Sequence, residues 1–394
     1  MIEATGSAKL PLGMTPARFL RDYWQKRPLL IRGFASSGFD SVTPDDLAGL
    51  ACEEAALSRI VSRDIKNDAW RLRSGPFSER DFARLGKNNW TLLVQDVDKW
   101  DMDVAAELDR FAFIPTWRID DVMISYATDG GGVGPHVDQY DVFLVQAAGA
   151  RRWGICTDPQ ATTTFRTDSE LRLLTEFSAT HEWLLEPGDA LYLPPGIPHD
   201  GVAVGECMTW SVGMRAPSQA ELLLDFAEFL AEPLGDERRY VDPDLELAHA
   251  QGEIDAAALR RVRAALPHFS AVDESTLAHW FGCFITRYRS AQIAAAADRA
   301  LSSTALLRAL PNATVLRNPF SRFAWRRDGR SAQLFVAGEA WSCSLPMAKL
   351  LAGERSLSGS AVSAACRDPA SQQTLVALVG AGHLQLSRRR TRAR

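Results

Sequence analysis

Short stretches of alternating apolar and polar residues dominate the first half of the chain. Trp90–Val97 and Val122–Ala127 are two of them, rich in β-branched and aromatic residues, a composition that predicts β-strands. Many short strands at this spacing, without long helices between them, predict an all-β barrel or a double-sheet jelly roll. The same pattern predicts strands at Pro28–Gly33, Ser58–Arg63, Trp70–Arg73, His181–Glu186 and Ala190–Leu193.

Two further pairs of strands are expected close to the middle of the chain. Asp141–Gln146 and Arg151–Cys156 are predicted to form a hairpin around Ala147–Ala150, and a final pair of strands is predicted at Gly201–Val204 and Met208–Met214. Short helices are expected among these strands, because Thr followed by Pro is typical of a helix start. They are predicted at Thr15–Trp24, from Thr43 onward, and at Phe77–Leu85 and Asp101–Phe111.

The pattern changes to a helical period after Ala216-Pro217. Apolar residues recur every three or four positions in Gln219–Leu230, Ile254–Leu266 and Glu274–Ser290, which predicts an α-helical segment. These helices either pack as a small bundle against the barrel of their own chain or form the interface of a dimer. The sequence pattern is compatible with both arrangements.

A third region begins near Leu301. Phe323–Arg327 and Gln333–Val336 flank Asp328-Gly329, a strong hairpin signal, and a small helix-rich domain with such a hairpin predicts a winged helix. The chain is therefore predicted to divide into residues 1–217, 218–300 and 301–394. The other elements expected in the third region are helices at Thr304–Leu310, Pro346–Leu351 and Ser371–Val379 and a strand at His383–Leu386.

Composition places the protein in the cytoplasm. No apolar run approaches the roughly 18 residues of a membrane span, and the first residues lack the layout of a signal peptide. The six cysteines are scattered without a C-x-x-C pair, which predicts reduced, buried thiols.

The net charge of −5 and the sequence pI near 5.9 argue against a broad basic face, so direct binding to nucleic acid is not expected. The exception is the arginine-rich end, Ser387–Arg394. We interpret it first as a solvated tail, and second as an electrostatic handle for RNA or an RNA-rich assembly.

The candidate functional residues lie in two segments, the glycine-rich run Gly130–Asp141 and the later segment Leu193–His199. Residues two apart on a strand share a face, so His136 and Asp138 can present an imidazole and a carboxylate to one point. A returning strand can bring His199 opposite them. Two histidines and one carboxylate leave about three positions open on an octahedral ion, as in non-haem Fe(II) oxygenases. By itself, His136 would be interpreted as a loop histidine that hydrogen-bonds its neighbours, and the surrounding glycine run and the distal histidine favour the metal ligand instead.

An Fe(II) centre that reduces dioxygen needs electrons from a co-substrate, and 2-oxoglutarate supplies them in a large class of enzymes. Its distal carboxylate requires a cation, for which Arg151 is the candidate because a guanidinium binds a carboxylate bidentately. Arg152 is expected on the opposite face. Ser125 can donate a hydroxyl hydrogen bond to the same carboxylate. The alternatives are an exposed arginine pair on a hairpin and an ordinary strand serine.

The chain resembles the jumonji C type of cupin oxygenases, and specifically the bacterial ribosomal oxygenases. The resemblance is carried by the Gly130–Asp141 run, Arg151-Arg152-Trp153 and Pro194–His199. The resemblance is dense from Phe113 to Pro217 and only architectural elsewhere. It implies a jelly-roll catalytic domain, a helical dimerisation region that makes the protein a homodimer, and a C-terminal winged-helix domain.

The resemblance also implies hydroxylation of a ribosomal protein. Bacterial members hydroxylate an arginine of the sixteenth large-subunit protein at the carbon next to Cα, and eukaryotic relatives hydroxylate ribosomal histidines. By position, the family's iron ligands fall on His136, Asp138 and His199, and its 2-oxoglutarate contacts fall on Ser125 and Arg151.

Other functions stay open at this point. The same metal site would serve a histidine hydroxylase or a demethylase, whereas a non-catalytic cupin would use metal and winged helix for binding or regulation. An arginine substrate needs acidic or aromatic partners near the metal. Asp129, Tyr140 and Asp141 are close in sequence, and turn capping or strand packing explains them equally well.

Overall fold

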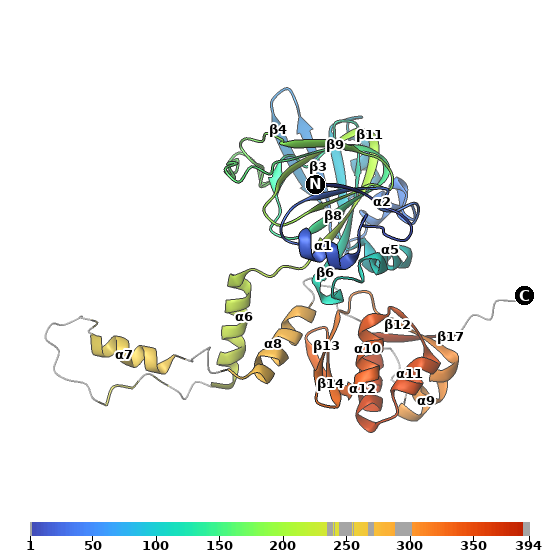
Figure 1. Cartoon of the computed structure of the whole chain (residues 1–394), viewed down its shortest axis with the longest axis vertical. Coiled ribbons are helices and arrows are strands. Elements are labelled where there is room, and N and C mark those ends of the chain that lie inside the picture. The colour runs from blue at the N-terminus through green and yellow to red at the C-terminus, as the bar shows by residue number, and fades with distance from the viewer. Residues whose placement is uncertain are drawn as a thin grey trace, which may run out of the picture. The chain divides into compact units, whose positions relative to one another are not determined.

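The computed structural model describes residues 2–234, 239, 241–243, 254, 256–266, 272–287 and 302–388. The chain divides into two compact units, one containing residues up to Ala216 and the other beginning at Pro217 (Figure 1). The predicted further division at residue 300 stays a prediction. None of the helices within the described ranges is long and apolar enough to cross a membrane.

The first unit is built on one sheet of eleven strands. Nine of them follow the order β1-β2-β10-β8-β11-β6-β5-β3-β4, and the other two, β7 and β9, pair with β11 and β8. Most neighbours are antiparallel and distant in sequence, as in a jelly roll. The strands are β1 (Glu3–Thr5), β2 (Leu29–Arg32), β3 (Ser58–Asp64), β4 (Ala69–Ser74), β5 (Trp90–Val94), β6 (Ile119–Ala127), β7 (His136–Val137), β8 (Val142–Ile155), β9 (His181–Leu185), β10 (Ala190–Leu193) and β11 (Pro198–Met214).

The two predicted strand pairs in the middle of the chain are wrong. Asp141–Gln146 and Arg151–Cys156 do not pair with each other but belong to the single strand β8, and Gly201–Val204 and Met208–Met214 both belong to β11. Each long strand pairs with the other along almost its whole length, with register shifts between Val204 and Thr209. The chain bends there instead of reversing, because a bulge increases local twist without ending the ladder.

Alternate residues of the central strands enter two different apolar clusters. Phe143 and Tyr192 join one cluster, whereas Leu144 and Leu191 join the other. The first cluster also contains Phe19 and Leu47, so helices cover that face of the sheet. The opposite face is therefore the one turned toward the interior of the barrel. The helices of this unit are α1 (Pro16–Asp22), α2 (Pro44–Leu50), α3 (Glu79–Ala83), α4 (Val97–Trp100) and α5 (Met102–Glu107), with 3-10 turns at Leu108–Phe111 and Thr116–Arg118.

Local sequence signals account for the starts of these helices. Thr15 accepts a hydrogen bond from the Arg18 backbone, and Thr43 forms a capping box with Asp46, each followed by proline as predicted. The predicted strand from Trp90 ends earlier, at Val94, because Val97 begins α4.

The second unit begins with helices and ends in two small sheets. The three predicted helices are present, although the end of the third, at Ser290, lies outside the described residues. Three strands and one helix were not predicted: β12, β15, β16 and α11. The elements are α6 (Gln219–Ala231), the 3-10 turn Glu232–Leu234, α7 (Ala256–Ala265), α8 (Glu274–Thr286), α9 (Ser303–Ala309), the 3-10 turn Leu310–Asn312, β12 (Ala313–Arg317), β13 (Phe323–Asp328), β14 (Ser331–Val336), β15 (Glu339–Ser344), α10 (Leu345–Gly353), β16 (Ser356–Ser358), α11 (Gly359–Ala365), α12 (Pro369–Gly380) and β17 (Leu384–Arg388).

The two small sheets of the second unit enclose one apolar core. One sheet has the order β16-β12-β17 and the other has the order β13-β14-β15. Val315, Leu334 and Leu351 join the core from β12, β14 and α10. Helix α8 also packs on this part of the unit, since Gly282 lies so close to the Phe335 ring that a Cβ atom would be 2.4 Å from it.

Candidate metal centre

Glycines bring His136 into the barrel. The φ angle of Gly134 is +79°, and a Cβ atom there would lie 2.7 Å from the Leu173 side chain. Glycine is therefore required on both counts just before His136. The short strand β7 follows, and it pairs with β11 so that His136 lies directly opposite His199. Two imidazoles that are 63 positions apart in the chain thus reach one place.

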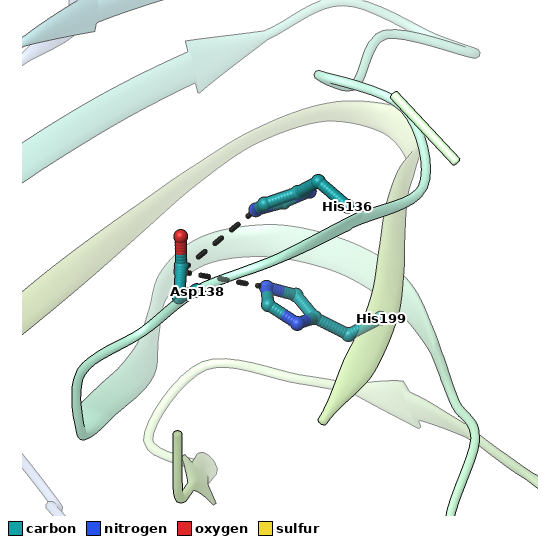
Figure 2. Close-up of side chains that lie close together, drawn as sticks. All are labelled: His136, Asp138 and His199. Carbon is teal, nitrogen blue, oxygen red and sulfur yellow. Dashed lines mark ion pairs between the residues drawn. The ribbon is translucent and has the colours of Figure 1, made fainter. Parts of the chain in front are cut away.

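Asp138 completes a cluster with the two histidines (Figure 2). Its Oδ2 atom lies 3.8 Å from Nε2 of His136 and 3.7 Å from Nε2 of His199. One ligand atom from each residue lies within 4.8 Å of the others. That spacing is compatible with three bonds of about 2 Å to a single metal ion placed between them.

Backbone carbonyls orient both imidazoles. The Nδ1 atom of His136 lies 2.8 Å from the Gly134 carbonyl oxygen, and Nδ1 of His199 lies 2.8 Å from the Ile197 carbonyl oxygen. A carbonyl only accepts, so each Nδ1 carries the proton and each Nε2 keeps its lone pair for a metal. Burial, together with nearby His136, lowers the pKa of His199 to about 3. His199 is therefore neutral at pH 7.

The charged form of the Asp138 carboxylate is disfavoured by its surroundings. Burial raises the pKa of Asp138, while the nearby imidazole of His136 and a hydrogen bond from Tyr140 oppose this effect. A buried carboxylate of this kind gains most from a cation, because a positive ion replaces the lost hydration. Partial burial and the Asp138 charge raise the pKa of Tyr140, which keeps its hydroxyl protonated as a donor.

The two neighbouring aspartates have structural roles. Asp141 is fully buried and accepts hydrogen bonds from the Tyr192 hydroxyl at 2.7 Å and from Arg118 at 3.2 Å. Asp129 accepts the backbone N–H of Gly205 at 2.8 Å. Of the three residues near the motif, only Tyr140 contacts the cluster, and its 41% exposure shows that it does not pack as a buried strand residue.

Arg151 lies on the same face of the sheet as His199. It pairs with Ala203, which is four residues from His199 along β11, so the three side chains point to one side. The guanidinium lies 5.7 Å from the Trp153 ring, and that ring lies 6.0 Å from the His199 ring. Arg152 is exposed, as predicted from the strand alternation.

Three buried donors on this face of the sheet have no hydrogen-bond partner among the described residues. They are the Nε and Nη2 groups of Arg151, which is 3% exposed, and the indole N–H of Trp153. A buried guanidinium without an acceptor is costly, so the pocket fits an anion with carboxylate geometry. Ser125 is also buried, on β6, where its hydroxyl donates to the Thr209 carbonyl at 3.3 Å.

Comparison with known proteins identifies the family. The JmjC domain family matches residues 107–222, and the ROXA-like winged helix family matches residues 265–385. Escherichia coli ribosomal protein uL16 3-hydroxylase is 38% identical over 280 residues, covering 69% of this chain and 71% of that protein. The chain belongs to the JmjC ribosomal oxygenases. A probable ribosomal oxygenase of Haemophilus influenzae is 38% identical over 240 residues, covering 61% of this oxygenase and 57% of that protein.

Solved structures match the oxygenase over nearly its whole length. The X-ray structure of E. coli ycfD gives a TM-score of 0.83 at 33% identity, covering 95% of this chain and 99% of that one. The structure of YcfD in complex with cobalt and 2-oxoglutarate gives a TM-score of 0.79 with the same coverage. These matches confirm the predicted fold class, and they identify the protein as a 2-oxoglutarate-dependent oxygenase.

All five predicted site residues lie in the barrel unit, and His136, Asp138 and His199 come together in one cluster. Their roles as ligands, and those of Ser125 and Arg151 toward 2-oxoglutarate, stay predictions. Sequence reasoning missed the place of Trp153 in this site, and it named Tyr140 as a neighbour of the metal without foreseeing its contact with Asp138. Trp153 was noted only as part of a motif, although its place two residues after Arg151 on one strand was a usable signal. The contact between Tyr140 and Asp138 had no comparable signal, because it depends on the loop after β7.

Proposed function

We propose that this oxygenase uses Fe(II), 2-oxoglutarate and dioxygen to hydroxylate an arginine side chain of the ribosomal protein uL16. The observation that carries the proposal is the His136–Asp138–His199 cluster with both Nε2 atoms directed at one point. The choice of uL16 is supported by the name of the E. coli relative. A uL16 substrate agrees with the cytoplasmic location expected from the sequence.

The donor set of the cluster suits Fe(II). Two imidazoles bound through Nε2 and one carboxylate would occupy three positions of an octahedral ion and would leave three for 2-oxoglutarate and dioxygen. With these bound, the centre converts 2-oxoglutarate and dioxygen into succinate and carbon dioxide and transfers the second oxygen atom to a substrate C–H bond. The role of the Gly134 and Ile197 carbonyls is to hold both histidines in the tautomer that binds metal.

Arg151 would hold the distal carboxylate of 2-oxoglutarate. Its unpaired Nε and Nη2 donors match the two oxygens of a carboxylate, and the Trp153 ring lies 5.7 Å from the guanidinium. The Ser125 hydroxyl would turn from the Thr209 carbonyl to donate to the same carboxylate. This arrangement orients the co-substrate so that its other end faces the metal ligands.

Asp121 supports arginine as the target side chain. It lies four residues before Ser125 on β6, and its charge contributes to the raised pKa of Tyr140 beside the cluster. Burial, reinforced by Asp96 and the neighbouring Asp120 and Asp98, raises the pKa of Asp121 to about 7. A carboxylate without enough positive charge around it is a natural partner for a guanidinium. Histidine stays the alternative target, because the metal cluster would serve it equally.

The test is the intact mass of the large-subunit ribosomal proteins from a strain that lacks this gene. The proteins are incubated with purified oxygenase, Fe(II), 2-oxoglutarate and air, and Asp138→Ala is the matched control. A gain of one oxygen atom on uL16, absent with the variant and mapped to an arginine by fragmentation, is the expected result.

Other outcomes would change the proposal in different ways. An oxygen atom on a histidine of another ribosomal protein would keep the chemistry and replace the target. Steady succinate formation without any mass gain would remove the ribosomal substrate, and no succinate at all would favour a non-catalytic metal-binding protein.

The helical region offers an interface for a second copy of the chain. Leu223 and Leu224 on α6 are 57% and 71% exposed, and Leu259 and Val262 on α7 are 57% and 44% exposed. Monomeric proteins seldom leave several large aliphatic side chains exposed on neighbouring turns of a helix. We therefore infer a homodimer that buries α6 and α7.

A further inference from the structure

The charge of the protein is distributed very unevenly along the chain. Residues 302–394 contain 14 Arg and Lys against 4 Asp and Glu, a formal charge of +10. The preceding 301 residues contain 30 Arg and Lys against 45 Asp and Glu, a formal charge of −15. The net charge of −5 is the sum of two strongly opposed parts. The expectation that the protein does not bind nucleic acid rested on that sum.

Part of the basic charge forms one surface on the β13–β14 hairpin and α10, which pack together (Figure 1). Arg327 follows Trp325 by two positions on β13, so both exposed side chains lie on one face. Arg330 lies in the hairpin loop, and Lys349 of α10 lies with its Nζ 5.9 Å from the centre of the Trp325 ring. We call Trp325, Arg327, Arg330 and Lys349 the hairpin patch.

The acidic residues around the hairpin patch do not cancel its charge. Glu274 of α8 is paired with Arg326, which alternates to the other face of β13, at 3.1 Å. The hairpin tip contributes one negative charge, from Asp328, whereas the patch contains three positively charged side chains. The patch therefore has an excess of positive charge, and the indole of Trp325 is 36% exposed within it.

The composition of the patch fits RNA better than an acidic protein. Arginine and lysine contact phosphates, and an exposed aromatic ring stacks on bases, which is the combination used by proteins that bind single strands. An acidic polypeptide would pair with the cations but would not need the indole. The acidic part of this oxygenase, in turn, is suited to attract a basic protein substrate. Ribosomal proteins are found among RNA, so opposite charges on the two parts are complementary to the two components of one assembly.

We propose that the hairpin patch binds RNA, with Arg327, Arg330 and Lys349 at phosphates and Trp325 stacked on a base. The proposal that the hairpin patch binds RNA does not depend on which residue is hydroxylated, because RNA binding requires no catalytic turnover. It gives the winged-helix domain a function separate from catalysis, which is to hold the oxygenase on RNA-containing particles.

The test is fluorescence anisotropy of a labelled 20-nucleotide oligouridine with the full-length protein at KCl concentrations from 50 to 200 mM. Arg327→Gln/Arg330→Gln is expected to weaken binding about 20-fold at 100 mM KCl and to reduce the log–log salt slope by about 1.4, because two phosphate contacts are lost. Trp325→Ala is expected to weaken binding about tenfold with the salt slope unchanged, because stacking releases no counterions.

The matched control is Arg308→Gln/Arg367→Gln, which removes two exposed arginines of the same unit outside the patch. It should change the affinity less than twofold. An equal loss in this control would show a diffuse effect of net charge and overturn the patch. The same conclusion follows if removal of residues 389–394 abolishes binding while the hairpin variants bind normally.

Two competing ligands test the choice of RNA. A labelled 20-residue polyglutamate or a 20-base-pair DNA duplex that binds as tightly as oligouridine, without any effect of Trp325→Ala, would overturn RNA as the partner. Succinate release with free uL16 is measured for every variant and should stay unchanged. Failure of that activity in the parent protein would count against the proposed function and leave the RNA result intact.

Discussion

Each imidazole of the metal centre is held by a backbone carbonyl two residues earlier in the chain, Gly134 for His136 and Ile197 for His199. This local contact sets the tautomer before any metal arrives. Among the described residues, no backbone group donates to the Asp138 carboxylate, and its orientation depends on the hydrogen bond from Tyr140. The three candidate metal ligands are thus positioned by two different means, one local and one tertiary.

Tyr140→Phe tests the tertiary contact. Loss of the hydroxyl leaves the Asp138 carboxylate without its side-chain donor, so the affinity for Co(II), followed by its visible absorption, should fall about tenfold. Tyr126→Phe is the matched control, since it removes a hydroxyl that hydrogen-bonds Glu206 instead. Equal Co(II) affinity in Tyr140→Phe and the parent would show that Tyr140 does not position the ligand.

Arg151→Gln tests the co-substrate pocket. Removal of a bidentate, buried partner should raise the KM for 2-oxoglutarate about 100-fold with a smaller effect on kcat, because ground-state binding is lost. Arg152→Gln deletes the adjacent, exposed guanidinium and should stay within about twofold of the parent. A similar KM in both variants would exclude Arg151 as the anchor.

Asp121 predicts how stability depends on pH. Its pKa of about 7 in the folded protein is far above 3.8, so the folded state retains a proton that the unfolded state releases. Folding stability therefore falls as pH rises from about 4 through 7. Asp121→Asn should remove this loss, which amounts to about 4 kcal/mol at most.

The measurement is the denaturation midpoint at pH 5 and pH 8. Asp121→Asn should gain stability relative to the parent at pH 8 and gain less at pH 5. Asp103→Asn, an exposed carboxylate on α5, is the control. If both variants follow the pH profile of the parent, Asp121 has no raised pKa.

The two long strands β8 and β11 carry most of the site. Strand β8 contains Arg151 and Trp153, and β11 contains His199. The pairing of the two strands therefore places the candidate 2-oxoglutarate anchor on the same face as the candidate metal ligand. The bend near Gly149 and Gly205 allows each strand to serve two sets of neighbours, β10 and β9 in the case of β8. A hairpin at this point would have separated these functional residues.

Gly149→Ala tests the bend. Gly149 has φ +59°, and a Cβ atom there would lie 2.0 Å from the Glu206 carbonyl oxygen. Backbone strain and overpacking together should lower the free energy of unfolding by about 2 to 4 kcal/mol, measured by chemical denaturation. Gly205→Ala, with φ +70° and open space around it, should cost about 1 kcal/mol. Equal losses would mean that close approach plays no part.

At the level of the complete chain, opposite charges and exposed leucines suggest separate surfaces for separate partners. The helical region contains the aliphatic residues, whereas the basic charge lies in the C-terminal region. Dimer formation and RNA binding would then be independent of each other. This independence makes each surface testable in a protein that retains the other.

Leu223→Glu/Leu224→Glu should dissociate the dimer. Each buried leucine contributes about 1.5 to 3 kcal/mol, so the dissociation constant should rise at least roughly 100-fold, measured by light scattering at micromolar concentration. Ile65→Glu, an exposed aliphatic residue in the turn between β3 and β4, should leave the mass unchanged. A parent protein that is monomeric under the same conditions would contradict the interface.

Much of the fold was predictable because its signals are local. The starts of α1 and α2 depend on a Thr-Pro pair, and the hairpin at Asp328-Gly329 depends on two residues. The metal motif was also predictable, since strand alternation requires only neighbouring residues. His199 was found because the Pro195–Pro198 turn before it is equally local.

The remaining features depend on partners that are distant in the sequence. Alternation within Asp141–Cys156 is the same for a hairpin and for one bent strand, and only pairing with β11 distinguishes them. Strand β12 is a strand because β16 and β17 flank it. The buried Asp141 and the ligand-orienting Tyr140 are adjacent in sequence, yet their roles differ because the fold buries one and turns the other to Asp138. Sequence alone determined which residues can bind a metal and where strands and helices start, whereas long-range packing decided which strands pair and which side chains meet.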